Sequence, residues 1–211
     1  MVTPALTPPE AVGFRHVGFA DRSTLHLLVR DMEFAGPIPP SRIPSAFTIR
    51  RTRPREHAAV LEVDRAAFGA GWGLDRFGFQ EALEATPSTR LRVVADRSDA
   101  IVGYCVTGRA RRRGYLQRLA VAPEQQGRGI GAALVADCLQ WCRRSRVARV
   151  VVNTQTGNAT AFDLYRRMGF VEADIGLVVL SLSLHLDPAP AVDQAQPPLA
   201  PPDRVRPGCA S

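Results

Sequence analysis

Residues 125–132, Gln-Gln-Gly-Arg-Gly-Ile-Gly-Ala, could bind a phosphate group. They follow an apolar segment, residues 116–122, that predicts a strand, and they precede a segment in which Ile130 and Leu134 recur at helical spacing. A helix that begins at these glycines would direct unpaired backbone N–H groups and the positive end of its dipole at an anion. The glycines would let that anion come close. We therefore predict an anion-binding loop, most simply one for a phosphorylated cofactor.

The glycine pattern alone does not identify the ligand. No Gly-Lys-Ser/Thr follows it, so it is not a Walker A loop. A dinucleotide-binding fingerprint would be followed about 20 residues later by a carboxylate, whereas residues 147–153 read Val-Ala-Arg-Val-Val-Val-Asn. Taken in isolation, a tight turn that feeds a helix explains the glycines equally well.

A second motif decides between these interpretations. Residues 158–170, Asn-Ala-Thr-Ala-Phe-Asp-Leu-Tyr-Arg-Arg-Met-Gly-Phe, predict a short helix that ends at Gly169. Both motifs, their order and their separation resemble the GNAT superfamily of acetyl-CoA-dependent N-acetyltransferases. Residues 126–131 match that family's Gln/Arg-x-x-Gly-x-Gly/Ala pyrophosphate loop, and residues 158–170 match its Asn-x-x-Ala-x-x-Leu-Tyr-x-x-x-Gly-Phe segment. The resemblance extends over residues 47–186.

The resemblance implies the GNAT fold, an α/β architecture with a mixed, mostly antiparallel sheet, helices on both faces, and strands splayed apart at the acetyl-CoA site. It implies acetyl-CoA as cosubstrate. No metal is expected, because no His, Cys and carboxylate set in the sequence has metal-ligand spacing. The loop N–H groups would hold the pyrophosphate, and the exposed edge of the preceding strand would pair with the pantetheine arm and offer a small oxyanion hole. The residues that the resemblance implies for cofactor binding are Leu119, Ala120, Val121, Gln126, Gly127, Arg128, Gly129, Ile130, Gly131, Ala132, Asn158 and Tyr165.

Tyr165 is the predicted general acid. A phenol with a pKa near 10 stays protonated at neutral pH and can protonate a leaving thiolate, and the resemblance implies a tyrosine beside the cofactor sulfur at this position. Because Tyr165 also continues the helical face of Phe162 and Met168, a role as a core aromatic is the alternative. Asn158 is expected to hydrogen-bond the cofactor, to cap its own helix, or both.

The sequence predicts no general base. Many members of the family carry a glutamate on the strand before the loop, where this chain has Gln117 and Arg118. The amine could instead lose its proton to water. Four carboxylates on the helices expected beside the acceptor site are candidates, although each is more simply a solvated helix charge: Asp64, Asp75, Glu81 and Glu84.

The acceptor is expected to be a primary amine that attacks directly. Residues 68–77, Phe-Gly-Ala-Gly-Trp-Gly-Leu-Asp-Arg-Phe, lie where the family builds the acceptor pocket, and their aromatic spacing is similar to the RimI group, which acetylates protein N-termini. The three glycines in the segment predict that it moves on substrate binding. We therefore favour a peptide or protein α-amine. A small-molecule amine and a non-catalytic acetyl-CoA-binding regulatory module stay open.

Composition indicates a cytoplasmic protein with one hydrophobic core. The 211 residues are 45% hydrophobic, enough to bury one core, and no apolar run suits a membrane span or a signal peptide. The four cysteines have neither CxxC nor zinc spacing, which fits a reducing compartment. All 27 basic residues are arginines, for a net charge of +7. Without interleaved aromatics or a binding motif, we do not expect nucleic-acid binding.

The chain divides into three predicted parts. Residues 1–45 form a proline-bounded arm with a short strand at residues 25–29, which could lie over the domain or contact a second copy in a homodimer. Residues 46–186 form the acetyltransferase domain, and residues 187–211 a disordered, proline-rich tail. The elements expected within the domain are strand 47–50, helices 56–67 and 75–85, hairpin strands 91–95 and 101–106, strand 116–122, a long helix from residue 130, a strand around Val150, a helix around Tyr165 and strand 177–184.

Overall fold

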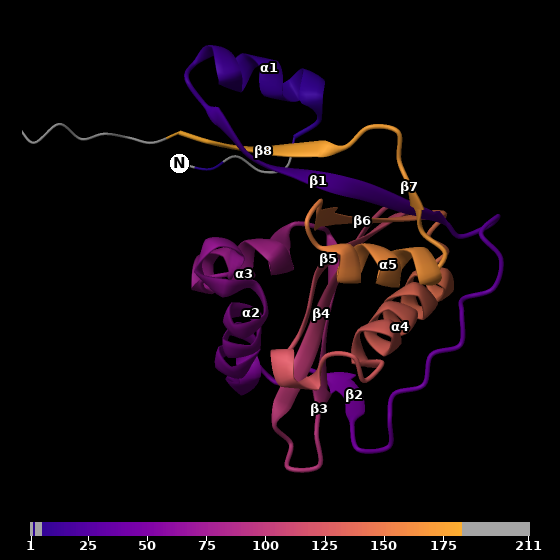
Figure 1. The fold of residues 1–211 in the computed structure, drawn as a ribbon. Helices are drawn as coiled ribbons and strands as arrows, with labels where there is room; N and C mark the ends of the chain where they lie inside the picture. The colour runs from indigo at the N-terminus through magenta and orange to yellow at the C-terminus, as the bar shows by residue number, and fades with distance from the viewer. Residues whose placement is uncertain (1, 3–5, 183–211) are drawn as a thin grey trace, which may run out of the picture.

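The computed structural model describes residue 2 and residues 6–182, and Figure 1 traces their fold. The elements follow in the order α1 (Pro8–His16), β1 (Ala20–Asp31), β2 (Thr48–Arg51), η1 (Pro54–Glu56), α2 (His57–Trp72), α3 (Arg76–Glu84), β3 (Ser88–Ala95), β4 (Ile101–Ala110), β5 (Arg113–Val121), η2 (Pro123–Gln125), α4 (Ile130–Arg144), β6 (Arg149–Gln155), α5 (Ala159–Arg167), β7 (Val171–Glu172) and β8 (Leu177–Ser181).

Eight strands form a single sheet in the order β2-β3-β4-β5-β6-β1-β7, with β8 also paired to β1. The pairing of β5 with β6 is parallel, and the other strand pairs are antiparallel. Figure 1 shows α2 and α3 on one face of the sheet and α4 and α5 on the other. A separate apolar core fills each side. The predicted mixed, mostly antiparallel sheet with helices on both faces is therefore confirmed.

Most predicted elements form within a few residues of their expected limits. The helix α4 begins at Ile130, directly after Gly129, and α3 begins after Asp75, whose carboxylate accepts a hydrogen bond from the Gly78 N–H at 2.8 Å. The helix predicted to end at residue 67 instead continues to Trp72. It is kinked at Gly69, whose φ of +68° is a left-handed conformation that glycine adopts without steric cost. The predicted final strand, 177–184, forms as β8, and the two-residue strand β7 before it was not predicted.

The segment before residue 45 is built into the sheet. The predicted strand 25–29 lies inside β1, which has 12 residues and pairs with β6 on one side and with β7 and β8 on the other. A helix that the sequence did not predict, α1, packs against β8 through Ala11, Val178 and Leu180. The division of the chain at residue 45 stays a prediction, and the predicted tail 187–211 lies outside the described residues. No helix in residues 6–182 is long and apolar enough to cross a bilayer.

A buried arginine joins β1 to the end of α5. Arg30 is 1% exposed, and its Nη1 donates a hydrogen bond to the Met168 carbonyl at 2.9 Å. Its Nη2 donates to the carbonyls of Gly36 and Pro37 at 2.9 and 3.2 Å. Burial lowers the pKa of Arg30. The Met168 carbonyl at the end of α5 therefore receives a cationic cap from a residue near the start of the chain.

Candidate active site

The strands β5 and β6 separate after a short parallel contact. Only residues 113–115 of β5 pair with residues 149–151 of β6, so the β5 edge from residue 116 to 121 has no strand partner on that side. On its other side, β5 pairs with β4. Val106 pairs with Arg118 and Thr107 pairs with Leu116, which leaves Gln117 in a β-bulge. The predicted splay is therefore present, and two cavities occupy it.

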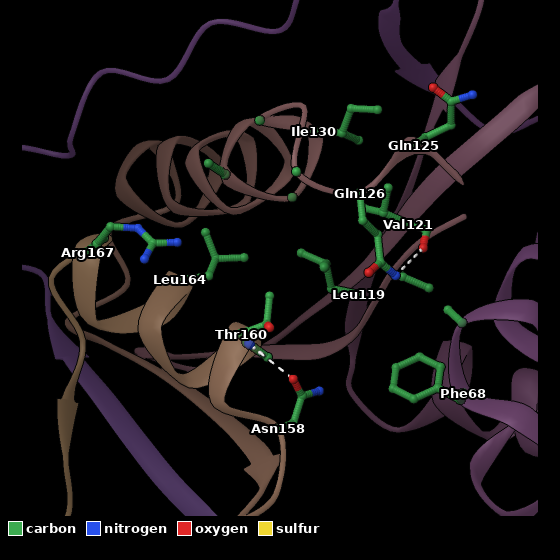
Figure 2. Close-up of a pocket in the computed structure, with 17 residues that line it drawn as sticks. Phe68, Leu119, Val121, Gln125, Gln126, Ile130, Asn158, Thr160, Leu164 and Arg167 are labelled. Atoms are coloured by element: carbon green, nitrogen blue, oxygen red, sulfur yellow. Dashed lines mark hydrogen bonds between the residues drawn. The ribbon is translucent and has the colours of Figure 1, made fainter. Parts of the chain in front are cut away.

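The larger cavity has a volume of about 560 Å³ and lies between the end of β5, the glycine loop, α4 and α5 (Figure 2). Its walls are mostly apolar, with polar groups from the loop and from the start of α5. It is lined by Ala67, Phe68, Leu119, Ala120, Val121, Gln125, Gln126, Gly127, Gly129, Ile130, Gly131, Ala132, Asn158, Thr160, Ala161, Leu164 and Arg167.

The glycine loop has the geometry of an anion-binding site. Gly127 and Gly129 have φ values of +74° and +80°, and no atom lies within 4 Å of the position that a β-carbon would take on either residue. The helix α4 follows directly after the loop. The Ala133 N–H donates a hydrogen bond to the carbonyl of Gly129, the N-cap residue of α4, at 3.0 Å. Within the described residues, the N–H groups of residues 127–132 have no hydrogen-bond partner, and they lie at the positive end of the helix. This cradle fits the pyrophosphate of a coenzyme.

Two polar residues of the loop make different contacts. Gln126 Nε2 donates to the Val121 carbonyl at 3.1 Å, which fastens the loop to the end of β5 (Figure 2). Arg128 instead donates to Gln125 Oε1 at 2.7 Å, and its guanidinium lies 5.1 Å from the Phe47 ring. Arg128 lines neither cavity, so its predicted part in cofactor binding rests on its backbone alone. The other predicted cofactor residues line the larger cavity, apart from Tyr165.

Arg167 is a lining residue that the sequence motif did not single out. It lies at the end of α5, and Figure 2 shows it at the opposite end of the cavity from Phe68. No hydrogen bond or ion pair joins its guanidinium to another described residue, so it can receive a phosphate oxygen. The sequence offers Arg166 and Arg167 as neighbours, and only the orientation of α5 decides which of them lines the cavity.

The smaller cavity, about 130 Å³, adjoins the larger one, because both are lined by Phe68, Leu119, Asn158 and Ala161. It lies in the gap between β5 and β6. Its remaining lining residues are Leu25, Trp72, Leu116, Gln117, Arg118, Val152, Asn153, Thr154, Gln155 and Tyr165. Among the described residues that line the two cavities, none is acidic. Within residues 6–182, no His, Cys, Asp and Glu side chains form a group that could hold a metal ion.

Tyr165 is both a core residue and a cavity residue. Its side chain is 5% exposed, and its ring lies edge-on to Phe170 with the centroids 5.8 Å apart. It also lines the smaller cavity. Burial raises the pKa of Tyr165, so the phenol holds its proton throughout the neutral range. Asn158 caps α5 by accepting a hydrogen bond from the Ala161 N–H at 3.1 Å, and it lines both cavities.

A buried ion pair supports the wall of the smaller cavity. Arg118 of β5 binds Asp64 of α2 through two bonds, Nε to Oδ2 at 2.7 Å and Nη2 to Oδ1 at 2.8 Å. Asp64 is completely buried, and it also accepts hydrogen bonds from the Tyr104 hydroxyl at 2.5 Å and the Leu74 N–H at 2.6 Å. With four donors around it, the carboxylate is a structural anchor and not a free base.

The same ion pair fixes the aromatic segment. Arg118 Nη2 donates to the Trp72 carbonyl at 2.6 Å, and its guanidinium lies 3.6 Å from the centre of the Phe68 ring. Arg22 of β1 donates to the Gly71 carbonyl at 2.6 Å. The segment is therefore held from two strands. The other carboxylates considered as bases, Asp75, Glu81 and Glu84, line neither cavity.

Comparisons with known proteins agree on one family. A family model described as "Acetyltransferase (GNAT) family" matches residues 55–170. Among curated proteins, the chain is similar to mycothiol acetyltransferase from Tsukamurella paurometabola, at 29% identity over 183 residues that cover 79% of this chain and 62% of that protein. It is also similar to a putative ribosomal protein bS18-alanine N-acetyltransferase from Bacillus subtilis, at 24% identity over 121 residues that cover 57% of this chain and 78% of that protein.

Solved structures share the fold at lower identity. A GCN5-related N-acetyltransferase from Sphaerobacter thermophilus matches with a TM-score of 0.62 and 22% identity, covering 83% of this chain and 57% of that one. The ribosomal-protein-S18-alanine N-acetyltransferase of Escherichia coli matches with a TM-score of 0.56 and 17% identity, covering 66% of this chain and 97% of that one. The chain spans between 47% and 62% of the length of the mycothiol acetyltransferases that it matches.

Proposed function

The chain belongs to the acetyltransferase (GNAT) family, and on that basis we propose that it transfers the acetyl group of acetyl-CoA to the α-amine of a peptide or protein. The observation that carries this proposal is the pair of adjoining cavities at the splay of β5 and β6. One is a largely apolar cavity that ends at a phosphate cradle, and the other is small and lined by both apolar and polar side chains. Acetyl-CoA supplies the acetyl group as a thioester.

The backbone provides most of the contacts for the cosubstrate. The N–H groups from Gly127 to Ala132 would hold the pyrophosphate, and Arg167 would add a cationic contact. The β5 edge offers the N–H and C=O of Leu119 and the N–H of Val121 to an amide-containing arm, which would bind in the manner of an added strand. A β5 N–H directed at the acetyl carbonyl would stabilise negative charge on its oxygen.

Tyr165 would hold the proton that the thiolate takes up. Its hydroxyl belongs to a side chain that lines the cavity next to the β5 edge, and its raised pKa keeps it protonated. On the acceptor side, no acidic residue lines the cavities, so the amine would pass its proton to water held by the amides of Asn153 and Gln155. This arrangement requires an amine that is already partly neutral, as an α-amine is near pH 8.

The size and polarity of the smaller cavity support an α-amine with a small first residue. At about 130 Å³, it has less than a quarter of the volume of the larger cavity, about 560 Å³. Its amide and hydroxyl groups, from residues 153–155, suit a neutral amide backbone. Two relatives whose names specify alanine N-acetylation of a ribosomal protein also support an α-amine acceptor. The relatives named mycothiol acetyltransferase favour the alternative, a small-molecule amine.

The test is an acceptor panel in which release of free CoA thiol is followed at constant acetyl-CoA. The panel contains peptides that begin with Ala, Ser, Gly, Leu or Glu, the same peptides with a blocked N-terminus, and amino sugars. We expect thiol release with small first residues and none with blocked peptides, and mass spectrometry should place the acetyl group on the α-nitrogen. Turnover restricted to the amino sugars would establish the small-molecule alternative. Tight acetyl-CoA binding without turnover on any amine would establish a non-catalytic module.

A further inference from the structure

One edge of the sheet has unpaired backbone. The strand β2 ends at Arg51, which pairs with Arg92, whereas β3 begins at Ser88. The residues of β3 from 88 to 91 therefore pair only with β4. Within the described part of the chain, the backbone of residues 89–91 makes no hydrogen bond on the outer side. At ~3.3 Å per residue, this open edge is about 13 Å long, the length of β2 itself.

A groove of about 610 Å³ runs along this edge, and arginines line it. Arg90 pairs with Asp137 at 2.9 Å, and Arg92 approaches the same carboxylate at 3.4 Å without a hydrogen bond from its buried Nε. Arg51 also lines the groove and forms no ion pair with a described residue. The groove thus holds three guanidinium groups, and only two of them approach a carboxylate, that of Asp137. The complete lining is Arg51, Thr52, Pro54, His57, Leu83, Ser88, Thr89, Arg90, Leu91, Arg92 and Trp141.

The arginines leave the strand edge accessible. Exposed β-sheet edges are commonly protected by charged side chains that project over them. Here Arg90 and Arg92 are turned over the sheet face towards Asp137 of α4, and their side chains are only 20% and 18% exposed. Thr52, at the end of β2, contributes a buried hydroxyl oxygen without a hydrogen-bond partner. The edge therefore offers unused hydrogen-bonding groups beside an excess of positive charge.

We propose that this groove binds an extended acidic peptide that adds a strand to the free edge of β3. The two faces of β3 define its pattern, because side chains on a strand alternate between faces. Arg90 and Arg92 share the α4 face with Asp137, whereas Leu91, like Leu83, packs against the core below α2 and α3. A peptide with acidic residues at alternate positions and apolar residues between them matches both faces.

The free edge favours a peptide over a nucleic acid. An extended peptide presents N–H and C=O groups that complement those of β3. A phosphate backbone carries acceptors only, so it would leave the β3 carbonyls unpaired, and single strands are bound by repeated aromatic stacking. Trp141 is the one aromatic residue other than His57 among the described groove residues. The groove lies away from the two cavities, so this proposal does not depend on acetyl transfer.

The experiment measures fluorescence anisotropy of a labelled Glu-Val-Glu-Val-Glu-Val peptide with the full chain. Its control peptide has the same sequence with N-methylated backbone nitrogens, which keep the charge but cannot form the strand bonds. We expect saturable binding of the first peptide and at least tenfold weaker binding of the second, a difference of about 1.4 kcal/mol. Amide hydrogen exchange at residues 89–91 should slow in the complex.

Two variants with the same charge change test the location. Arg51→Glu should weaken binding roughly tenfold or more, because a carboxylate would then face the acidic peptide. Arg55→Glu, on an exposed residue outside the groove, should bind nearly as the parent does. Circular dichroism spectra and thermal unfolding of both variants verify that they are folded. Equal binding of the two peptides, equal effects of the two variants, or displacement of the peptide by a single-stranded oligonucleotide at lower concentration would each overturn the proposal.

Discussion

The guanidinium of Arg30 occupies the space that a side chain on Gly169 would need. A β-carbon built on Gly169 collides with Arg30 Nη1, the atom that caps the Met168 carbonyl. Gly169 also has a φ of +81°, which ends α5. Two constraints therefore require glycine at this position of the Asn158–Phe170 motif. One is the positive φ of its backbone, and the other is the buried guanidinium from β1 beside it.

Gly169→Ala should lower the free energy of unfolding by about 3 kcal/mol or more, through backbone strain together with displacement of Arg30. Gly36→Ala is the matched control, because Gly36 has a φ of +72° with no atom near the β-carbon position. That variant should lose only about 1–2 kcal/mol. Urea denaturation measures both, and equal losses would contradict the role of Arg30.

Arg118→Met should destabilise the protein by ~3–5 kcal/mol, because it leaves the Asp64 carboxylate buried without its cation. It should also raise KM for the acceptor more than KM for acetyl-CoA, since the aromatic segment loses its contact at Trp72. The double variant Asp64→Asn/Arg118→Met should recover much of the stability. Chemical denaturation and steady-state kinetics provide the readouts, and a double variant no more stable than Arg118→Met would argue against the ion pair.

Tyr165→Phe should reduce kcat by about a hundredfold or more while leaving acetyl-CoA affinity unchanged. The hydroxyl makes no hydrogen bond to another described residue, so folding should be preserved. Because burial raises the pKa of Tyr165 above 10, this residue should produce no fall in kcat between pH 7 and pH 10. The measurements are thiol release and calorimetric titration with acetyl-CoA. Parent-like turnover would rule out the acid role.

Arg167→Gln should weaken acetyl-CoA binding about tenfold, the effect of losing one charge-assisted contact. Arg166→Gln removes the same charge from an exposed neighbour that does not line the cavity, so it should bind as the parent does. Calorimetric titration of each variant distinguishes a specific contact from general attraction by positive charge. Similar losses in the two variants would favour the general effect.

Acid should destabilise the β2 region through Glu56. Hydrogen bonds from Arg50, and then from the Arg53 N–H, lower the pKa of Glu56 from 4.5 to about 2. Since the unfolded chain binds this proton more readily, the stabilisation is present above pH 4.5 and is lost as pH falls towards 2. Glu56→Gln should flatten the dependence of unfolding free energy on pH in that window. The exposed Glu62→Gln is the control and should retain the slope.

Local patterns predicted most of the residues that line the larger cavity. The glycine loop, the start of α4 and the Asn158 cap depend on residues within a few positions of one another, so their geometry follows from backbone rules. Arg128 differs because its side chain can turn either way from a loop. The Arg128 side chain lies against Phe47, and the residue pattern of 125–132 could not predict this contact with a distant part of the chain.

Long-range pairings could not be predicted in the same way. The Arg118–Asp64 pair joins residues 54 positions apart, and the sequence presents each of them as an ordinary charged residue on an element. Arg30 is similar, since nothing near it in the chain indicates that it is buried against α5. The role of β1 depends on which strand has a free edge after β6 forms, a property of the assembled sheet.

The place of β1 in the sheet has a consequence for biosynthesis. Its residues pair with β6 residues that are made about 120 positions later. At a translation rate of roughly 5–20 residues per second, β1 waits on the order of ten seconds before its partner exists. During that interval its apolar side chains and both backbone edges stay unsatisfied. Closure of the sheet around β1 is then a late folding event. A nascent chain halted before residue 149 would expose an unpaired, aggregation-prone strand to chaperones and to neighbouring chains.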